Sequence, residues 1–478
     1  MIQQKKAIGF FYGVGFFTIL YLLLKTKPLV SFSDFALFEW QIKLVLQGKF
    51  SLPYSFISTD PNLDFFPLPD LFFHLSPNGV DSTFPNLYPI LVAPIYFTFG
   101  KFGIQIIQVA LLFLSLWFFY QIKKDHLFSL LLLFGSSIPI YTNLIHDTIL
   151  VFFLEILVLY YLHKKSILLA SFLSIVLIWM RPEFGFVIVL LPFFFEWRTI
   201  GKQFFVWCLC FGVIFACTNW IVFDTFFPLR LLKNASYHWN SKIVLYLFRL
   251  LVEQIPIFSL FFIFSLTQLF FKKFRLVTMG LFVSTCLILI LSPNTGGHNT
   301  PRYFYCLVPL YILSISLGPT FDSQKRKAFT LLFLILMIYS VYKWTDQSKE
   351  LMKISKFQTN TLTALSSITE KTFVFNNSDF SFVALPILES GKNLLLLRKP
   401  PEENDLGQFL NENQIESFVF LELPPSPFPI PDTLKIPGCK TSCEFKRMKT
   451  QSLPDTMLPI TLTQFTRIHN EIKKLGLD

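Results

Sequence analysis

The sequence predicts an α-helical polytopic membrane protein of about eleven transmembrane helices, followed by a C-terminal extracytoplasmic α/β domain. Three observations predict this fold class: the composition, the succession of apolar runs, and the positions of the basic residues between the runs. Of the 478 residues, 53% are hydrophobic and only 15% are charged. Because soluble proteins carry about 25% charged residues, so many apolar side chains cannot all be buried in one soluble core. The composition therefore excludes an ordinary cytosolic enzyme and indicates a protein that spans a membrane.

The first apolar run, residues 7–24, is uncharged and long enough to cross a bilayer. A signal peptide is the alternative interpretation, but no small-residue cleavage site follows the run, so we expect a retained helix. The other predicted spans are residues 102–121, 127–142, 147–163, 166–180, 184–197, 203–223, 256–271, 276–292, 303–318 and 328–344.

Basic residues form short clusters at every second connection between these runs. The clusters are Lys5/Lys6, Lys123/Lys124, Lys164/Lys165, Arg198/Lys202, Lys272/Lys273/Arg275 and Lys325/Arg326/Lys327. Since cytoplasmic loops carry an excess of Lys and Arg, the alternation places the N-terminus in the cytoplasm and the C-terminal domain outside. It also accounts for the net charge of +11, so we expect no nucleic acid partner.

Residues 25–84 form the first extracytoplasmic loop, which is rich in Pro, Asp, Ser and Phe. Residues 85–99 are apolar but short and contain three prolines, so we expect a juxtamembrane helix on the outer face rather than a span. The composition changes sharply near residue 345. We therefore predict a transmembrane domain over residues 1–344 and a soluble domain over residues 345–478.

The predicted soluble domain has short apolar runs instead of continuous ones. The segments KTFVF, NLLLL and SFVFLEL alternate with helix-like stretches near 355–369 and 402–414, a pattern typical of a small α/β domain. Cys439 and Cys443 occur in this domain as CKTSC. No pair of histidines lies nearby, so a structural disulfide is a better interpretation than a zinc site.

Ionisable residues gather at the outer ends of the predicted spans, while the inner ends carry mainly Lys and Arg. The outer group comprises Asp34, Glu39, His146, Asp147, Arg181, Glu183, His298 and Arg302. A carboxylate can take a proton from an acceptor hydroxyl, and Arg or His can stabilise a phosphate leaving group. The pattern is typical of a catalytic cavity that opens outward, with Asp34 as its catalytic residue.

Each of these residues also has a structural interpretation. Asp34 and Asp147 each stand where an acid caps a helix, and Arg181 and Glu183 are close enough in sequence to pair with each other. Glu155 lies in the middle of a predicted span, where a carboxyl is either functional or neutral and hydrogen-bonded. Its depth places it too far from the outer cavity to be included among the candidates.

The order of these features resembles the GT-C superfamily of integral-membrane glycosyltransferases. An acidic motif opens the first outer loop (SDFALFEWQIKLVLQG, with Asp34), and an aromatic and proline-rich segment ends in Phe-Gly (FPNLYPILVAPIYFTFG). A span that opens with Asp147 follows, then an RPE turn with Arg181 and Glu183, and a late PRYF motif with Arg302 and Tyr303. A soluble external tail completes the pattern. The resemblance covers residues 7–344.

The resemblance implies an inner-membrane enzyme that moves a sugar from a polyprenyl-phosphate donor to an extracytoplasmic glycan, lipid or protein acceptor. Asp34 would be the general base. Glu39, Asp147 and Glu183 would support it on the acceptor side. The lipid phosphate would be bound by Arg181, His298, Arg302 and Tyr303. A single displacement would make the enzyme an inverting hexosyl- or pentosyltransferase.

The chain departs from the family pattern at two points. Many members have an adjacent Asp-Glu pair in the first loop, whereas Asp34 and Glu39 are separated by four residues. This leaves open whether a divalent cation (Mg²⁺ or Mn²⁺) is a cofactor. The proline-rich segment reads PNLYP rather than the commoner Pro-Pro-Leu-Tyr.

Two other functions compete with this interpretation. A polysaccharide polymerase or ligase of the cell envelope would have its largest external loop late among the spans and rich in Arg, whereas the long loop here is first and acidic. A transporter or lipid flippase would have broken helices near the midplane or a repeat between its halves. Apart from Glu155, the sequence contains neither feature.

Overall fold

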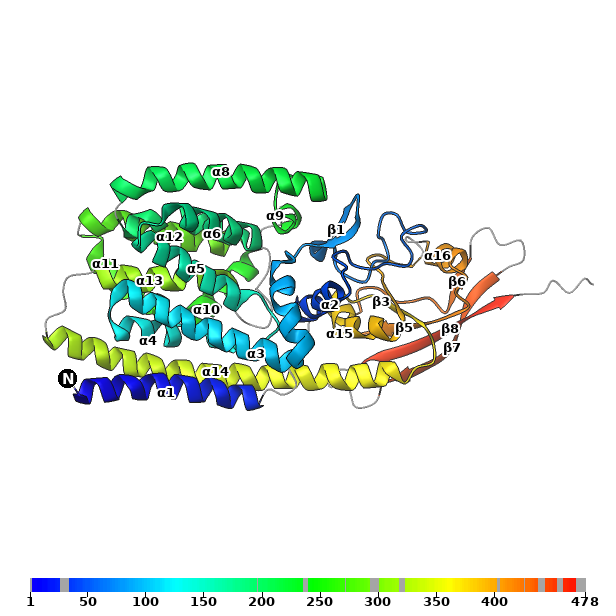
Figure 1. The fold of residues 1–478 in the computed structure, drawn as a ribbon. Helices are drawn as coiled ribbons and strands as arrows, with labels where there is room; N and C mark the ends of the chain where they lie inside the picture. Colours follow the sequence, from blue (N-terminus) through cyan, green and yellow to red (C-terminus); the bar gives the residue numbers. More distant parts are fainter. Residues whose placement is uncertain are drawn as a thin grey trace, which may run out of the picture.

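The computed structural model describes residues 2–25, 34–195, 197–234, 240–270, 272–292, 301–317, 323–401, 405–424, 426–436, 443–453 and 459–469. A bundle of helices occupies one end of the molecule and a β-sheet domain the other (Figure 1). The first loop lies between them. The predicted fold class, a polytopic α-helical protein with a C-terminal α/β domain, is confirmed.

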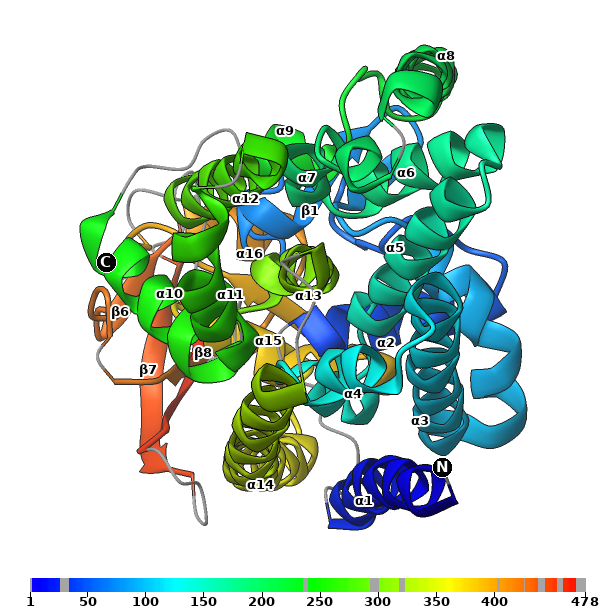
Figure 2. The same cartoon turned by 90° about the vertical axis from the view of Figure 1, so that its left-hand side faces the viewer.

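The bundle is built mainly from apolar helices. Its first half comprises α1 (Ile2–Lys25), α3 (Leu87–Lys123), α4 (His126–Phe134), η2 (Ile138–Asn143), α5 (Thr148–His163), α6 (Ile167–Met180), η3 (Pro182–Phe184), α7 (Gly185–Ile188) and η4 (Leu191–Phe194). Its second half comprises α8 (Trp197–Phe223), α9 (Leu229–Asn234), α10 (Ser241–Gln254), α11 (Pro256–Gln268), α12 (Lys272–Leu291), η5 (Arg302–Leu307), α13 (Val308–Leu317) and α14 (Ser323–Ser366). Helix α13 is central and packs against α4, α11 and α12, whereas α8 lies at the edge of the bundle (Figure 2).

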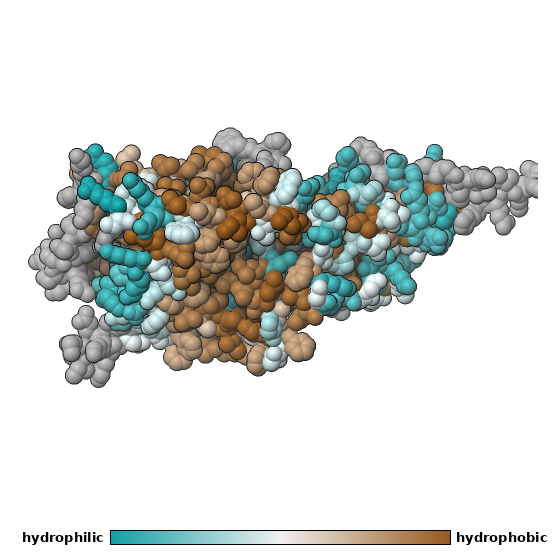
Figure 3. Space-filling view, turned by 45° about the horizontal axis from the view of Figure 1, so that its top comes forward, coloured by the Kyte–Doolittle hydropathy of each residue, from teal (hydrophilic) through white to brown (hydrophobic). Residues whose placement is uncertain are grey.

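Several helices have the length and composition of membrane spans. Among the described residues, four are long and apolar enough to cross a bilayer: Leu87–Lys123, Trp197–Phe223, Phe274–Leu291 and Ala328–Ser366. Helices α10 and α11 would form a fifth span bent by 90°, and four shorter apolar helices accompany them. The face in Figure 3 has a broad hydrophobic band over the bundle, with polar surface at both ends. The protein is therefore a multi-span membrane protein, while the number of eleven spans stays a prediction.

Prolines and a glycine interrupt three of the predicted apolar segments. Helix α3 contains both the predicted juxtamembrane helix and the following span, separated by a kink at Gly100, whose φ of 60° and ψ of −153° suit only glycine. Helix α4 ends at Phe134, and most of the rest of the predicted span 127–142 is the 3₁₀ helix η2, which contains Pro139. The predicted span 184–197 is a series of short turns around Pro192. Proline lacks the amide hydrogen that a continuous helix requires.

The first loop is ordered by its own polar contacts. It contains α2 (Asp34–Leu46), η1 (Asp70–Phe72) and an antiparallel hairpin of β1 (Phe73–Ser76) and β2 (Gly79–Ser82). Between α2 and η1, the Asp60 carboxylate accepts the backbone amides of Asp64 (2.8 Å) and Phe65 (2.9 Å) and the hydroxyl of Tyr54 (2.5 Å). A segment without regular structure is thus held in one conformation.

The C-terminal domain contains a six-stranded mixed sheet with strand order β4-β3-β5-β8-β7-β6. Its elements are β3 (Thr372–Phe375), α15 (Ser378–Ala384), η6 (Leu385–Ser390), β4 (Asn393–Leu396), α16 (Leu406–Glu412), β5 (Ser417–Glu422), β6 (Thr433–Lys435), β7 (Cys443–Ser452) and β8 (Thr461–His469). Strand β3 is parallel to β4 and β5, and the other pairs are antiparallel. The three predicted apolar runs are β3, β4 and β5, which are buried on both faces. Helix α14 runs through residue 344 without a break, so the predicted domain boundary there stays a prediction.

Arg398 in the C-terminal domain holds the first loop against that domain. Its guanidinium donates to the carbonyl oxygens of Leu63 (3.2 Å), Asp64 (2.6 Å), Phe66 (3.0 Å) and Leu68 (2.5 Å), and pairs with Asp70 (2.8 Å). Next to this contact, Phe382 and Leu385 pack in one apolar cluster with Leu37 and Phe38 of α2. The C-terminal domain therefore fixes the position of α2, the helix that begins at Asp34.

We expect Arg398→Ala to lower the free energy of unfolding by about 2 kcal/mol, because hydrogen bonds to a charged group are lost and loop carbonyls are left without donors. Thermal unfolding in detergent and limited proteolysis of residues 49–72 measure the effect. The matched control is Arg447→Ala, since Arg447 lies at the surface, where it pairs with Asp432, whose side chain is 82% exposed, and donates to Thr450. Equal stability of the two variants would contradict the proposed docking contact.

Candidate functional site

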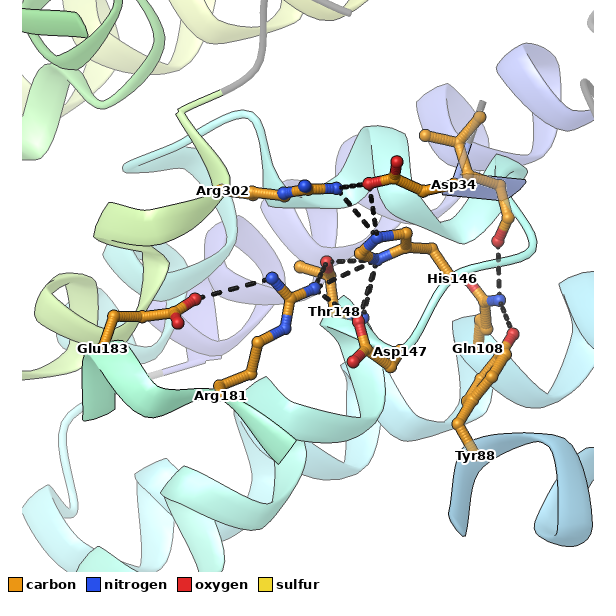
Figure 4. A network of polar contacts seen from close by, with 10 residues as sticks. Asp34, Tyr88, Gln108, His146, Asp147, Thr148, Arg181, Glu183 and Arg302 are labelled. Atoms are coloured by element: carbon orange, nitrogen blue, oxygen red, sulfur yellow. Dashed lines mark hydrogen bonds and ion pairs between the residues drawn. The ribbon is translucent and has the colours of Figure 1, made fainter. Parts of the chain in front are cut away.

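Four chain segments that are distant in sequence meet at one end of the bundle, beside the first loop. Asp34 begins α2, Asp147 directly precedes α5, Arg181 follows α6, and Arg302 begins η5 (Figure 4). These side chains are buried: the exposed fraction is 4% for Asp34, 1% for Asp147, 3% for Arg181 and 7% for Arg302. The sequence analysis placed these residues at the same ends of their spans, and the structure brings their side chains into contact.

The charges form two buried ion pairs. Arg302 donates to the Asp34 carboxylate, and Arg181 donates to the Asp147 carboxylate. Arg181 also contacts Glu183, with 3.5 Å between Nη1 and Oε1. Since an isolated charge is costly to bury, these pairs are what allow so many ionised groups to lie out of water.

Local sequence explains how Arg181 is presented. Pro182 disfavours helical backbone at the residue before it, and Arg181 is extended, with φ of −143° and ψ of 93°. Helix α6 therefore ends at Met180, and the Arg181 side chain reaches across to α5. Asp147 stands at the N-cap of α5 without a side-chain capping bond, so its side chain serves the ion pair.

His146 lies between the two ion pairs and connects them. Its Nε2 is 3.2 Å from Nη1 of Arg302, and its Nδ1 is 3.0 Å from Oδ1 of Asp147. The backbone amide of Thr148 also donates to Nδ1 (3.2 Å), and Nη2 of Arg181 lies 3.3 Å from the same nitrogen. Complete burial lowers the pKa of His146 to about 4, which leaves the imidazole neutral at physiological pH. Edge-on rings of Phe35, Phe38 and Tyr141 surround it.

Arg230 is a third arginine near this group, and the sequence analysis did not single it out. It lies on α9, only 5% exposed, with its guanidinium 4.7 Å from the centroid of the Phe84 ring. Burial and the positive charge of Arg181 lower the pKa of Arg230 to about 10. Its Nη1 has no hydrogen-bond partner among the described residues. The signal in the sequence is weak, because Arg230 lies in a short helix with other apolar and basic residues.

Glu39 does not join the ion pairs. Its carboxylate contacts Lys101 (2.8 Å), Lys43 (3.3 Å) and the hydroxyl of Tyr96 (3.0 Å), and thereby connects α2 to α3. Lys43 in turn pairs with Glu389 of the C-terminal domain at 2.6 Å. The supporting role predicted for Glu39 on the acceptor side stays a prediction.

A small cavity lies beside the arginines, inside the bundle. Its lining includes Arg181, Glu183, Arg302, Tyr303 and Glu155. The Tyr303 ring also lies 5.4 Å from the Arg302 guanidinium. The expectation that Glu155 lies too deep for the site is wrong, because Arg302 and Tyr303 begin η5, which descends into the bundle beside α5.

Three predicted residues lie wholly or partly outside what the structure describes. His298 and Cys439 fall outside the described residues, and only the backbone of Cys443 is described, as the first residue of β7. In the described parts of the chain, no group of three or more His, Cys, Asp or Glu side chains could hold a metal ion. The carboxylates of the site are instead paired with arginines.

The described structure combines three parts: a multi-span helical bundle, an ordered first loop that begins with a buried acid, and a C-terminal sheet domain. Among solved structures, the chain is similar to that of ArnT from Cupriavidus metallidurans in the apo state. The two are 10% identical, with a TM-score of 0.50 over 97% of this chain and 98% of that chain. At this identity the likeness establishes the fold. No protein-family model matches the sequence, and neither does any curated protein sequence.

We expect Asp147→Asn to lower the free energy of unfolding by about 3 to 5 kcal/mol, because it leaves the buried Arg181 charge without its main partner. The double variant Asp147→Asn/Arg181→Gln is expected to lose less than the sum of the two single variants, since it removes both charges. Chemical unfolding in detergent measures all four proteins. Additive losses would show that the two side chains are not coupled.

Proposed function

We propose that the protein is a GT-C-type membrane glycosyltransferase. It moves a sugar from a polyprenyl-phosphate donor to a glycan, lipid or protein acceptor outside the inner (plasma) membrane. One observation carries this proposal: a buried carboxylate, Asp34, lies in contact with Arg302 and beside Arg181 at the ends of the spans. A base next to paired cations is the arrangement that transfer from a glycosyl phosphate requires.

The arginines supply the binding site for the phosphate. Nε of Arg181, Nε of Arg302 and Nη1 of Arg230 are buried and lack hydrogen-bond partners among the described residues. Guanidinium groups bind phosphate oxygens with good geometry and retain their charge when buried. The phosphate of a lipid donor would satisfy these donors, and Tyr303 and His298 complete the predicted lipid-phosphate group.

The Asp34–Arg302 pair couples donor binding to the strength of the base. While Arg302 contacts Asp34, it stabilises the carboxylate form and makes Asp34 a weak base. A bound phosphate would compete with Asp34 for the guanidinium. Arg302 would then serve the phosphate, and Asp34 would be free to accept a proton.

The reaction is a single displacement at the anomeric carbon. The acceptor oxygen forms a bond to this carbon as its proton passes to the Asp34 carboxylate. The bond between the anomeric carbon and the phosphate oxygen breaks, and its electron pair leaves with the polyprenyl phosphate. Arg302 and Arg181 stabilise the charge that develops on the phosphate. One displacement inverts the anomeric configuration.

Two further observations support this proposal. The N-terminus and the sheet domain lie at opposite ends of the bundle, in agreement with a cytoplasmic N-terminus and an extracytoplasmic C-terminal domain (Figure 1). An open groove of about 660 Å³ between α2 and the sheet domain, lined by Trp40, Lys43, Glu389 and Lys392 among others, offers space for an acceptor.

The proposal is tested in a deletion strain that carries wild-type protein, Asp34→Asn or Asp64→Asn at matched expression. Asp64 is the control, because it is an exposed acid of the same loop. We expect Asp34→Asn to reduce transfer at least ~100-fold, the usual effect of losing a general base. Mass spectrometry of lipids and surface glycans would then find one sugar missing and its polyprenyl-phosphate form accumulated.

The opposite result is equally informative. If Asp34→Asn restores the wild-type profile as fully as Asp64→Asn does, Asp34 is not catalytic. A transporter or flippase would then become the better interpretation. A deletion strain that lacks surface glycan without accumulating a lipid-linked monosaccharide would instead favour a polymerase or ligase.

A further inference from the structure

Glu155 is a buried carboxyl group that no contact in the described structure explains. It lies on α5, is 1% exposed, and neither of its side-chain oxygens has a hydrogen-bond partner among the described residues. Leaving such a group unsatisfied costs several kcal/mol in an apolar environment. Ionisable side chains at such positions inside a membrane bundle generally mark a functional site.

The cavity that Glu155 lines connects this carboxyl to the candidate active site. Arg181 and Arg302 lie along the same cavity. Glu155 follows Thr148, another residue of its wall, by two helical turns, which is about 10 Å along α5. The rest of the wall is formed by Val151, Phe152, Glu183, Phe184, Tyr303, Tyr305 and Cys306.

The composition of the wall indicates which part of a glycosyl phosphate would enter the cavity. A phosphate held by the two arginines is bonded to a prenyl chain on one side and to a sugar on the other. A prenyl chain offers no hydrogen-bond donor, whereas this wall contains the carboxyl groups of Glu155 and Glu183, and Glu155 has no partner among the described residues. A sugar offers hydroxyl donors for the carboxyls and C–H groups for aromatic faces such as Phe152.

We propose that this cavity is the subsite for the donor sugar and that Glu155 determines sugar specificity by accepting hydrogen bonds from its hydroxyl groups. The inference rests on the proposed function, because it takes the phosphate position from the arginines. Beyond that function, it identifies the donor sugar as the hydrogen-bond partner of Glu155. It assigns this residue to recognition of the sugar rather than to the chemical step.

The cavity in this structure is small, about 20 Å³, which is enough for one water molecule. Arg181 and Arg302 form part of the cavity wall. They are held in place by their ion pairs with Asp147 and Asp34, respectively. When the phosphate draws the two guanidinium groups away from these carboxylates, the cavity widens toward the phosphate. The sugar then enters the cavity and supplies the hydrogen bonds that Glu155 lacks.

The test compares binding of lipid phosphates with and without a sugar to the purified full-length protein in nanodiscs. The probes are a short-chain polyprenyl phosphate and the same lipid linked to glucose, galactose, mannose or arabinose. We expect the preferred sugar to increase the affinity of the wild-type protein at least tenfold over the bare lipid phosphate. In Glu155→Leu this gain should disappear, while affinity for the bare lipid phosphate changes less than threefold.

Glu155→Gln keeps the shape of the side chain and one acceptor oxygen, so it should retain part of the gain and carries the test if Glu155→Leu does not fold. Ser115→Ala is the control, because Ser115 is buried in α3 and its hydroxyl donates to the Leu111 carbonyl of the same helix. It should preserve the full gain. The sugar selectivity of Glu155→Gln should also be flatter across the four sugars than that of the wild-type protein.

Two outcomes would overturn the inference: a full gain in both Glu155 variants, or no gain from any sugar in the wild-type protein. Failure of the proposed function has a different signature. In that case the bare lipid phosphate would not bind the wild-type protein, or would bind Arg302→Gln equally well.

Discussion

The buried ion pair between Arg302 and Asp34 is the interaction on which the rest of the structure depends. It joins the first loop to a late segment of the bundle, 268 residues apart in sequence. Because removing either partner would leave an uncompensated charge out of water, the two segments are held in contact. His146 connects this pair to Arg181 and Asp147, so one network fixes the ends of α5, α6 and η5 relative to α2.

The C-terminal domain supports this network from outside the bundle. Arg398 binds the carbonyls of the first loop, and Lys43 of α2 pairs with Glu389. These contacts set the position of α2, and therefore of Asp34, through residues far from the arginines. A substrate phosphate would have to compete with a carboxylate that is held in place on two sides. The same competition would prepare the base and widen the cavity that ends at Glu155.

Particular residues show how far the sequence alone could lead. The strands β3, β4 and β5 were visible because both of their faces are buried and they read as continuous apolar runs. The strand β7 was not, because its segment, CEFKRMKTQS, is largely polar. The predicted spans 127–142 and 184–197 are interrupted in the structure, at Pro139 and Pro192. Hydrophobicity averaged over a whole run does not reveal that a proline lacks the backbone donor that a helix needs. Arg230 was missed because nothing in a short basic helix indicates that one cation is buried.

The sequence by itself determined that this is a multi-span membrane protein with a C-terminal α/β domain, since composition and apolar runs depend only on local chemistry. It also determined which ionisable residues lie together at the outer ends of the spans, because the alternation of basic clusters assigns each end of a span to one side of the membrane. Only the tertiary structure decided which carboxylate pairs with which arginine. Likewise, only the tertiary structure pairs Glu39 with Lys101 and places Glu155 in the same cavity as Arg302. Those choices depend on how helices distant in sequence rotate and pack, and no local pattern encodes that geometry.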